Sequence, residues 1–217
     1  MKKIDTKTIK QIMKEQKITE YYYTIGEDSK EMPVVGVYHK NDWDHGYDGN
    51  SGFLGTRRSF YQDFFEMINF LREFLNETKC SKCIIAPFKR YKYFEYNDET
   101  CDIYVELKGK LNENNIRINS QAGLEISLKD DFSVLEAFVE GAFRGISLGC
   151  LYFSEINVLL TPTHHFEMPF WTYEADKYAQ IIKQIANSCD NICFYQEETG
   201  DGSEMCQGDG SVDTQAD

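Results

Sequence analysis

The sequence predicts an α+β fold in which a largely antiparallel mixed sheet is packed by three to four amphipathic helices. Apolar residues recur at helical spacing in several segments, and short alternating or β-branched runs indicate strands between them. These strand runs follow one another too closely for regular β-α-β alternation, which favours α+β over a parallel α/β class. We predict a single domain over residues 1–195 and a disordered acidic tail over residues 196–217.

The first half of the chain contains two helical patterns. Near the N-terminus, Ile9 and Ile12 share one helix face, and Asp5 or Thr6 is the expected cap. Ser59 opens a capping-box pattern before a long apolar stripe. In chain order, the predicted elements are a helix over 5–17, strands over 21–25 and 33–39, a loop over 41–55 and a helix over 59–76.

The second half mixes alternating and continuous apolar patterns. Ile103, Val105 and Leu107 alternate, and the short links that follow predict an antiparallel meander. The apolar run 150–160 is typical of a central strand covered on both faces. In chain order, the predicted elements are strands over 83–88, 102–108, 115–120 and 123–128, a helix that begins near Asp130 and Asp131, a strand over 150–160, a loop between Pro162 and Pro169, a helix from Thr172 to Cys189 and a strand over 191–195.

The charge of the chain restricts its partners. The formal net charge is −13, and the segment from Gln196 to Asp217 holds seven acidic residues without Lys or Arg, which leaves −6 on the rest. Nucleic acid and anionic lipid bind clustered cations, so the acid surplus argues against both. A basic protein partner, such as a toxin, suits this charge better.

The N-terminus and the hydropathy pattern bear on location. The opening residues contain several lysines and no apolar stretch of the kind found in a secretory signal. No apolar run approaches the roughly 20 residues needed to span a bilayer. We therefore expect a cytoplasmic protein without a membrane partner.

The seven cysteines do not resemble a disulfide scaffold, because their number is odd and their spacing is scattered. We expect reduced thiols. Cys80 and Cys83 have the C-x₂-C spacing of half a zinc site, but no second pair follows at a fitting distance. A helix-to-strand turn explains the pair more simply, and we expect no cofactor.

Two polar loops contain the candidate functional residues. The loop 41–50 offers carboxylate oxygens but departs from the EF-hand pattern, so its expected role is to display aromatic and acidic side chains. The second loop holds His164, His165 and Glu167, which with His45 would supply a two-His-plus-carboxylate metal site. Acidic residues also line the outer face of the helix after Asp131. The predicted binding residues are Trp43, Asp44, Asp48, Glu136, Glu140 and Trp171.

Three functional hypotheses follow. The chain lacks the nucleophile-elbow, phosphate-loop and dinucleotide-binding motifs, so we expect a protein that is not an enzyme. The first hypothesis is a non-catalytic acidic protein that neutralises a basic partner, as immunity proteins, antitoxins and inhibitors of nucleic-acid enzymes do. The second is a metal-dependent hydrolase that uses His164 or His165 with His45 and nearby carboxylates. The third is a scaffolding domain that acts through its tail.

Overall fold

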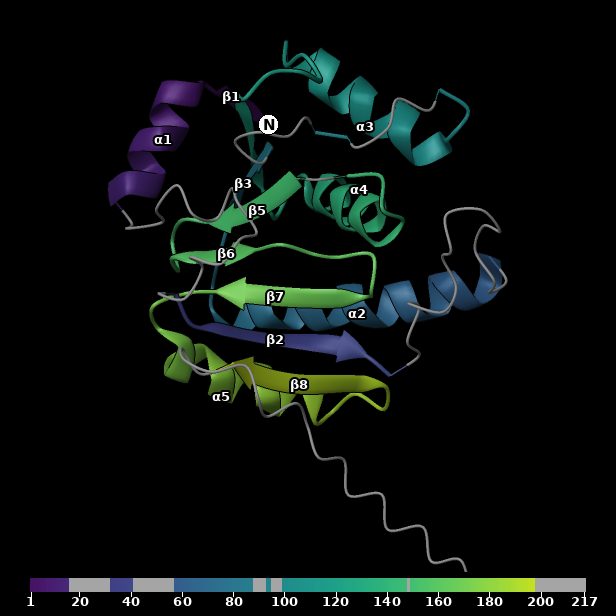
Figure 1. Cartoon of the computed structure of the whole chain (residues 1–217), viewed down its shortest axis with the longest axis vertical. Helices are drawn as coiled ribbons and strands as arrows, with labels where there is room; N and C mark the ends of the chain where they lie inside the picture. The colour runs from purple at the N-terminus through teal and green to yellow at the C-terminus, as the bar shows by residue number, and fades with distance from the viewer. Residues whose placement is uncertain (16–31, 41–56, 88–92, 95–98, 148, 198–217) are drawn as a thin grey trace, which may run out of the picture.

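A single eight-stranded sheet organises the protein (Figure 1). The structure is a computed structural model that describes residues 1–15, 32–40, 57–87, 93–94, 99–147 and 149–197. The strand order is β1-β4-β3-β5-β6-β7-β2-β8, and every neighbouring pair is antiparallel. The strands are β1 (Lys2–Ile4), β2 (Val34–His39), β3 (Lys82–Pro87), β4 (Gly123–Ser127), β5 (Gly149–Phe153), β6 (Val158–Leu160), β7 (Glu167–Trp171) and β8 (Ile192–Glu197).

Five helices pack against this sheet within the described ranges, somewhat more than the predicted three to four. They are α1 (Thr6–Glu15), α2 (Arg57–Glu77), α3 (Asp102–Glu113), α4 (Phe132–Phe143) and α5 (Ala175–Ala186). The predicted α+β class is confirmed. None of these helices combines the length and the apolar character needed to cross a membrane.

The helices divide between the two faces of the sheet. The larger core cluster joins α2, α3, α4 and α5 to one set of alternating strand residues, which we call the first face. The smaller cluster joins Ile9 of α1 to the opposite set, which includes Ile84, Tyr152 and Leu159, and this set defines the second face. Strand residues alternate in direction, so one sheet builds both cores.

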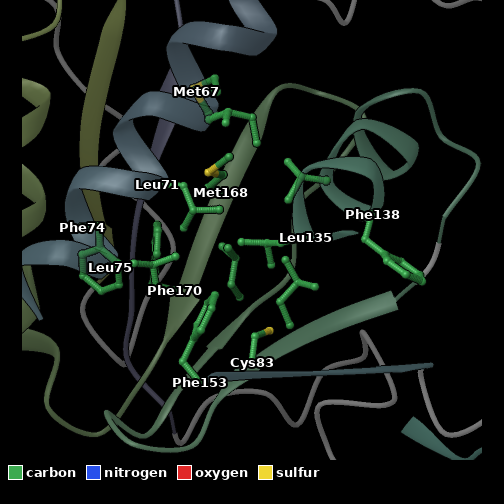
Figure 2. Packing of buried hydrophobic residues seen from close by; sticks show 14 of the residues in the cluster. Met67, Leu71, Phe74, Leu75, Cys83, Leu135, Phe138, Phe153, Met168 and Phe170 are labelled. Atoms are coloured by element: carbon green, nitrogen blue, oxygen red, sulfur yellow. The ribbon is translucent and has the colours of Figure 1, made fainter. Parts of the chain in front are cut away.

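The core on the first face is dominated by aromatic and branched side chains (Figure 2). Phe74 of α2 lies with its ring centroid 4.8 Å from that of Phe170 on β7 and 5.9 Å from that of Tyr178 on α5. All three are fully buried. A single position on α2 therefore connects this helix, the sheet and α5.

The predicted helices at 5–17, 59–76 and after Asp131 are present with small shifts of their ends. Asp5 caps α1, because its Oδ1 accepts a hydrogen bond from the Thr8 amide at 2.9 Å. The expected start at Ser59 is wrong, because α2 begins two residues earlier at Arg57. The predicted strands at 33–39, 83–88, 123–128 and 191–195 match β2, β3, β4 and β8, whereas the segment 21–25 lies outside the described residues.

The predicted meander between 102 and 120 is wrong. Residues 102–113 form α3, in which Ile103, Tyr104, Leu107 and Leu111 are buried and Val105 is 47% exposed. Ile103 and Leu107 are one helical turn apart, so the period that decides the element is 3.6 and not 2. The segment 115–120 forms turns, with Asn115 in the left-handed region at φ 56°.

The predicted strand over 150–160 and the predicted loop between Pro162 and Pro169 both need correction. The run 150–160 is a hairpin of β5 and β6, because Asn157 adopts a left-handed turn conformation at φ 52° between them. Pro169 lies inside β7 and not at the end of a loop. Its carbonyl accepts from the Thr161 amide at 3.2 Å, so the bond that proline cannot make would have joined Thr161, just past the end of the short strand β6, and not the long partner strand β2.

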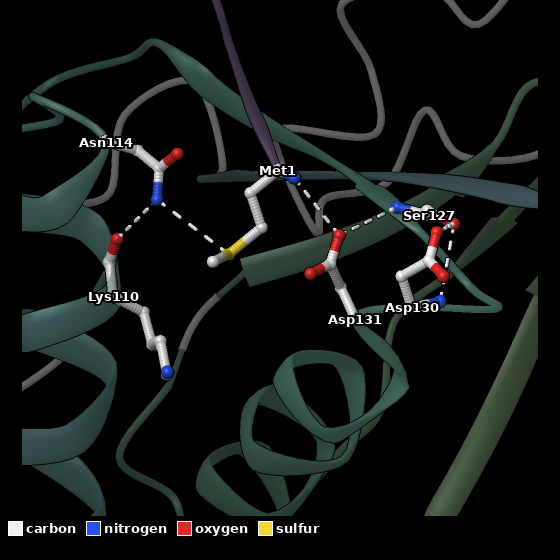
Figure 3. Close-up of polar contacts among 6 residues, drawn as sticks. All are labelled: Met1, Lys110, Asn114, Ser127, Asp130 and Asp131. Carbon is white, nitrogen blue, oxygen red and sulfur yellow. Dashed lines mark hydrogen bonds and ion pairs between the residues drawn. The ribbon is translucent and has the colours of Figure 1, made fainter.

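The short strand β1 is held at the edge of the sheet by contacts far apart in sequence (Figure 3). The Met1 ammonium donates to Oδ2 of Asp131 at 3.1 Å, and the Ser127 amide donates to the same oxygen at 3.3 Å. Asn114 donates to the Lys110 carbonyl at 2.9 Å and approaches the Met1 sulfur at 3.8 Å. The ends of α3, α4 and β4 therefore meet at the first residue.

Two phenylalanines of α2 provide a matched test of this packing. We expect Phe74→Ala to lower the free energy of unfolding by about 3–5 kcal/mol, because it empties a fully buried site. Phe65→Ala, on the exposed side of the same helix, should change it by less than about 0.5 kcal/mol. Urea denaturation of both variants measures the difference, and equal losses would contradict the orientation of α2.

Candidate interaction surface

The predicted binding residues are divided between different parts of the molecule. Trp43, Asp44 and Asp48 lie outside the described residues. Glu136 and Glu140 lie on α4, over the first face, whereas Trp171 packs against the cluster on the second face. Trp171 is only partly exposed, and its indole N–H donates to Thr161 Oγ1 at 2.9 Å. Among the described residues, the α4 acids and Trp171 therefore do not form one surface.

The two acids of α4 are paired with arginines of the same chain. Glu136 accepts from Arg72 of α2 at 2.7 Å, and Glu140 lies 2.6 Å from Arg144. Glu140 also accepts from the Tyr61 hydroxyl at 3.0 Å. These contacts connect α2 to α4 and neutralise much of the charge that the sequence analysis offered to a basic partner.

The described part of the chain is less acidic than the whole. It contains 21 Asp and Glu against 18 Lys and Arg, a net charge of −3, and the remaining segments carry the other −10. Five lysines lie in the first 15 residues. For binding a charged partner, where the exposed carboxylates lie on the surface therefore matters more than their total number.

Three carboxylates gather where α2 passes the end of α5. Glu66, Glu73 and Asp190 all lie close enough to the Cys189 thiol to raise its pKa, in addition to the larger effect of burial. In the described structure, neither Glu73 nor the Asp190 carboxylate makes a salt bridge, and both side chains are exposed. The Lys40 ammonium lies beside them and donates to the Asp190 carbonyl at 2.6 Å, so two exposed carboxylates and one lysine share this place.

An exposed aromatic residue lies on the same side of α2. Phe65 is 56% exposed, the most among the large exposed hydrophobic residues of the described chain. Its ring is supported by Tyr61 at 5.9 Å and Phe64 at 5.5 Å between centroids. Phe65 and Glu73 lie eight residues apart, which places them along one ridge of the helix. We call Phe65, Glu66, Asn69, Glu73 and Asp190 the α2 surface.

A buried polar network fixes the inner border of this surface. His39, at the end of β2, has a fully buried side chain, and its Nε2 lies 3.6 Å from Asp63 and 3.3 Å from Glu66. Asn191 donates to Glu66 twice, from its backbone N–H and from Nδ2, both at 3.1 Å. The network joins β2, α2 and the start of β8.

His39, Asp63 and Glu66 are not among the predicted binding residues. The available signal was the pair of acids three residues apart on the helix 59–76, next to its apolar stripe. His39 closes a strand that is otherwise apolar, so pattern alone gives it no partner. The contact depends on how α2 lies across the sheet.

The hypothetical metal site is only partly described. His164 and His165 lie in the turn before β7, and their ring centroids are 3.9 Å apart. His45 lies outside the described residues. Within those residues, no group of three or more His, Cys, Asp or Glu side chains is arranged to hold a metal ion.

Cys80 lies in the predicted turn between α2 and β3, whereas Cys83 is the second residue of β3. Burial raises the pKa of Cys80 to about 12 and holds that of Cys83 well above its usual range. The Cys80 thiol donates to the Lys82 carbonyl at 3.3 Å. All six described cysteines are free thiols.

No protein-family model matches the sequence, and no curated protein or solved structure is significantly similar to it. A functional proposal therefore depends on the surface and its chemistry.

The Glu66 network predicts a pH effect on stability. Burial raises the pKa of Glu66, but hydrogen bonds from Asn191 and His39 lower it further, to a value below the usual 4.5. Because the folded pKa is depressed, its contribution to stability is present above about pH 4.5 and is lost as pH falls through the folded value. We expect Glu66→Gln to lose less stability than the wild type between pH 6 and pH 3.

Glu73→Gln is the matched control, because Glu73 is exposed on the same helix and makes no hydrogen bond to Asn191 or His39 in the described structure. Urea denaturation across this pH range compares the three proteins. Equal pH dependence in Glu66→Gln and the wild type would show that the network does not stabilise the Glu66 carboxylate.

Proposed function

We propose that this protein is a non-catalytic binding protein that engages a basic partner protein through the α2 surface. The observation that carries the proposal is the solvent-exposed Phe65 on the same helix as the exposed carboxylate of Glu73, which makes no salt bridge among the described residues. Buried aromatic anchors supply much of the affinity of a protein interface, and surrounding charges steer the encounter. A cationic, partly apolar surface on the partner would complement both features.

The class of partner follows from the same chemistry. A protein that binds nucleic acid displays clustered cations, and a small acidic protein that covers them blocks that activity. Inhibition of a toxin or of another nucleic-acid enzyme, in the manner of an immunity protein or antitoxin, is the finer form of the proposal. It is supported by the overall charge of −13 and by the exposed side chains of Glu73 and Asp190.

Affinity capture with matched variants tests the proposal. We expect the wild type to retain a basic protein at low salt and to release it at high salt, because steering charges are screened. Phe65→Ala should weaken this association by about tenfold or more. Glu73→Lys should mainly lower the association rate, which is measured by binding the captured protein to immobilised variants.

Glu106→Lys is the control for Glu73→Lys, because it makes the same charge change at an exposed position on α3. It should bind like the wild type. If Phe65→Ala and Glu73→Lys retain the same proteins at the same rates as Glu106→Lys, the α2 surface is not the binding site. The metal content of the purified protein, measured in parallel, tests the hydrolase hypothesis.

Removal of the tail separates this proposal from the scaffolding hypothesis. The last strand runs to Glu197, so truncation should begin at Glu198 to leave β8 intact. We expect the truncated protein to retain the captured partner, because the α2 surface remains. Loss of binding, with unchanged urea denaturation, would favour a scaffold that acts through residues 198–217.

A further inference from the structure

The two edge strands of the sheet differ in how they would meet another strand. β1 has three residues, and both Lys2 and Lys3 are exposed, features that discourage further pairing. β8 has six residues, contains no proline, and carries no charge before Glu197. Among the described residues, only β2 pairs with β8. Within the part of the chain that the structure describes, β8 therefore lacks the usual protection of an edge.

The register shows which backbone groups of β8 face outward. The Lys40 amide donates to the Asn191 carbonyl at 2.8 Å, which places Asn191 on the side of β2. Backbone groups alternate along an antiparallel strand, so Ile192, Phe194 and Gln196 direct theirs away from β2. In the described structure these three residues make no further backbone hydrogen bond. They form the outer edge of β8.

We infer that the outer edge of β8 pairs with the same edge of a second copy of this chain. The two strands run antiparallel about a two-fold axis at Phe194, and Ile192 of each copy faces Gln196 of the other. Each outward-facing pair exchanges two hydrogen bonds, so the pairing closes about six. The symmetric arrangement is closed and produces a dimer, not a fibre.

The charges around β8 favour pairing with a second copy of the chain, and they favour the antiparallel direction. The positions that face each other between residues 192 and 196 contain no charged side chain. On α5, Asp176 accepts from Gln196 Nε2 at 3.5 Å, and the Lys183 ammonium lies 5.9 Å above the Phe194 ring. Antiparallel pairing brings the Asp176 of one copy towards the Lys183 of the other, because Gln196 and Phe194 are only two residues apart.

The antiparallel direction places the C-terminal ends of the two β8 strands at opposite ends of the pairing. Phe65 and Glu73 lie on α2, whereas Asp190 lies two residues before Ile192, so Asp190 is the part of the α2 surface next to the pairing. The variants at Phe65 and Glu73 therefore test the proposed basic partner separately from the dimer.

A proline at the outward-facing position Gln196 tests the pairing. Gln196→Pro removes one outward N–H per copy at an exposed edge position where proline is tolerated. We expect sedimentation velocity of the full chain to show a concentration-dependent dimer for the wild type and Gln196→Ala. Gln196→Pro should weaken that dimer by roughly tenfold or more, while its urea denaturation remains close to that of Gln196→Ala.

Hydrogen exchange gives a second measurement that does not depend on a variant. The amide of Phe194 should exchange more slowly as concentration rises, because it enters the new ladder, whereas the amide of Tyr195 is bonded to β2 at every concentration. A monomer at all concentrations, or exchange of Phe194 that does not change with concentration, overturns the inference. A dimer that Gln196→Pro leaves intact overturns it as well.

Discussion

The packing of α2 across the first face of the sheet is the constraint on which the rest of the structure depends. Its inner side brings Phe74 to Phe170 and Tyr178 and so joins the helix layer to the strands. Its N-terminal half brings Asp63 and Glu66 to His39, and its outer side presents Phe65 and Glu73 to solvent. Three different sides of α2 thus contribute to the core, to the polar network and to the α2 surface.

This arrangement decides which acidic side chains are paired within the protein and which are exposed to a partner. The acids of α4 are satisfied by Arg72 and Arg144 and serve to connect helices. Those near the end of α5 keep their charge exposed. A basic partner would therefore meet local carboxylates beside an aromatic side chain, because the described fold as a whole is close to neutral. Such a surface favours specificity over non-specific attraction.

Local patterns predicted much of the fold, and long-range contacts explain the failures. The stripes of α2 and α4 are long and regular, so they could be recognised from spacing alone. The segment 102–108 fits both periods in its apolar residues, and the burial of Tyr104 and Leu111 with the exposure of Val105 distinguishes α3 from a strand. The contact of His39 with Asp63 and Glu66 and the partners of Glu136 and Glu140 could not be predicted, because they depend on how helices cross the sheet.

The most direct measurement is hydrogen exchange of the protein with and without a captured basic partner. Binding through the α2 surface predicts that amides of α2 around Phe65 and Glu73, and those next to Asp190, become more protected in the complex, while α3 is unchanged. Protection confined to α3, to the second face around Trp171 or to residues after Glu197, with no change on α2, would contradict the proposed mode of binding.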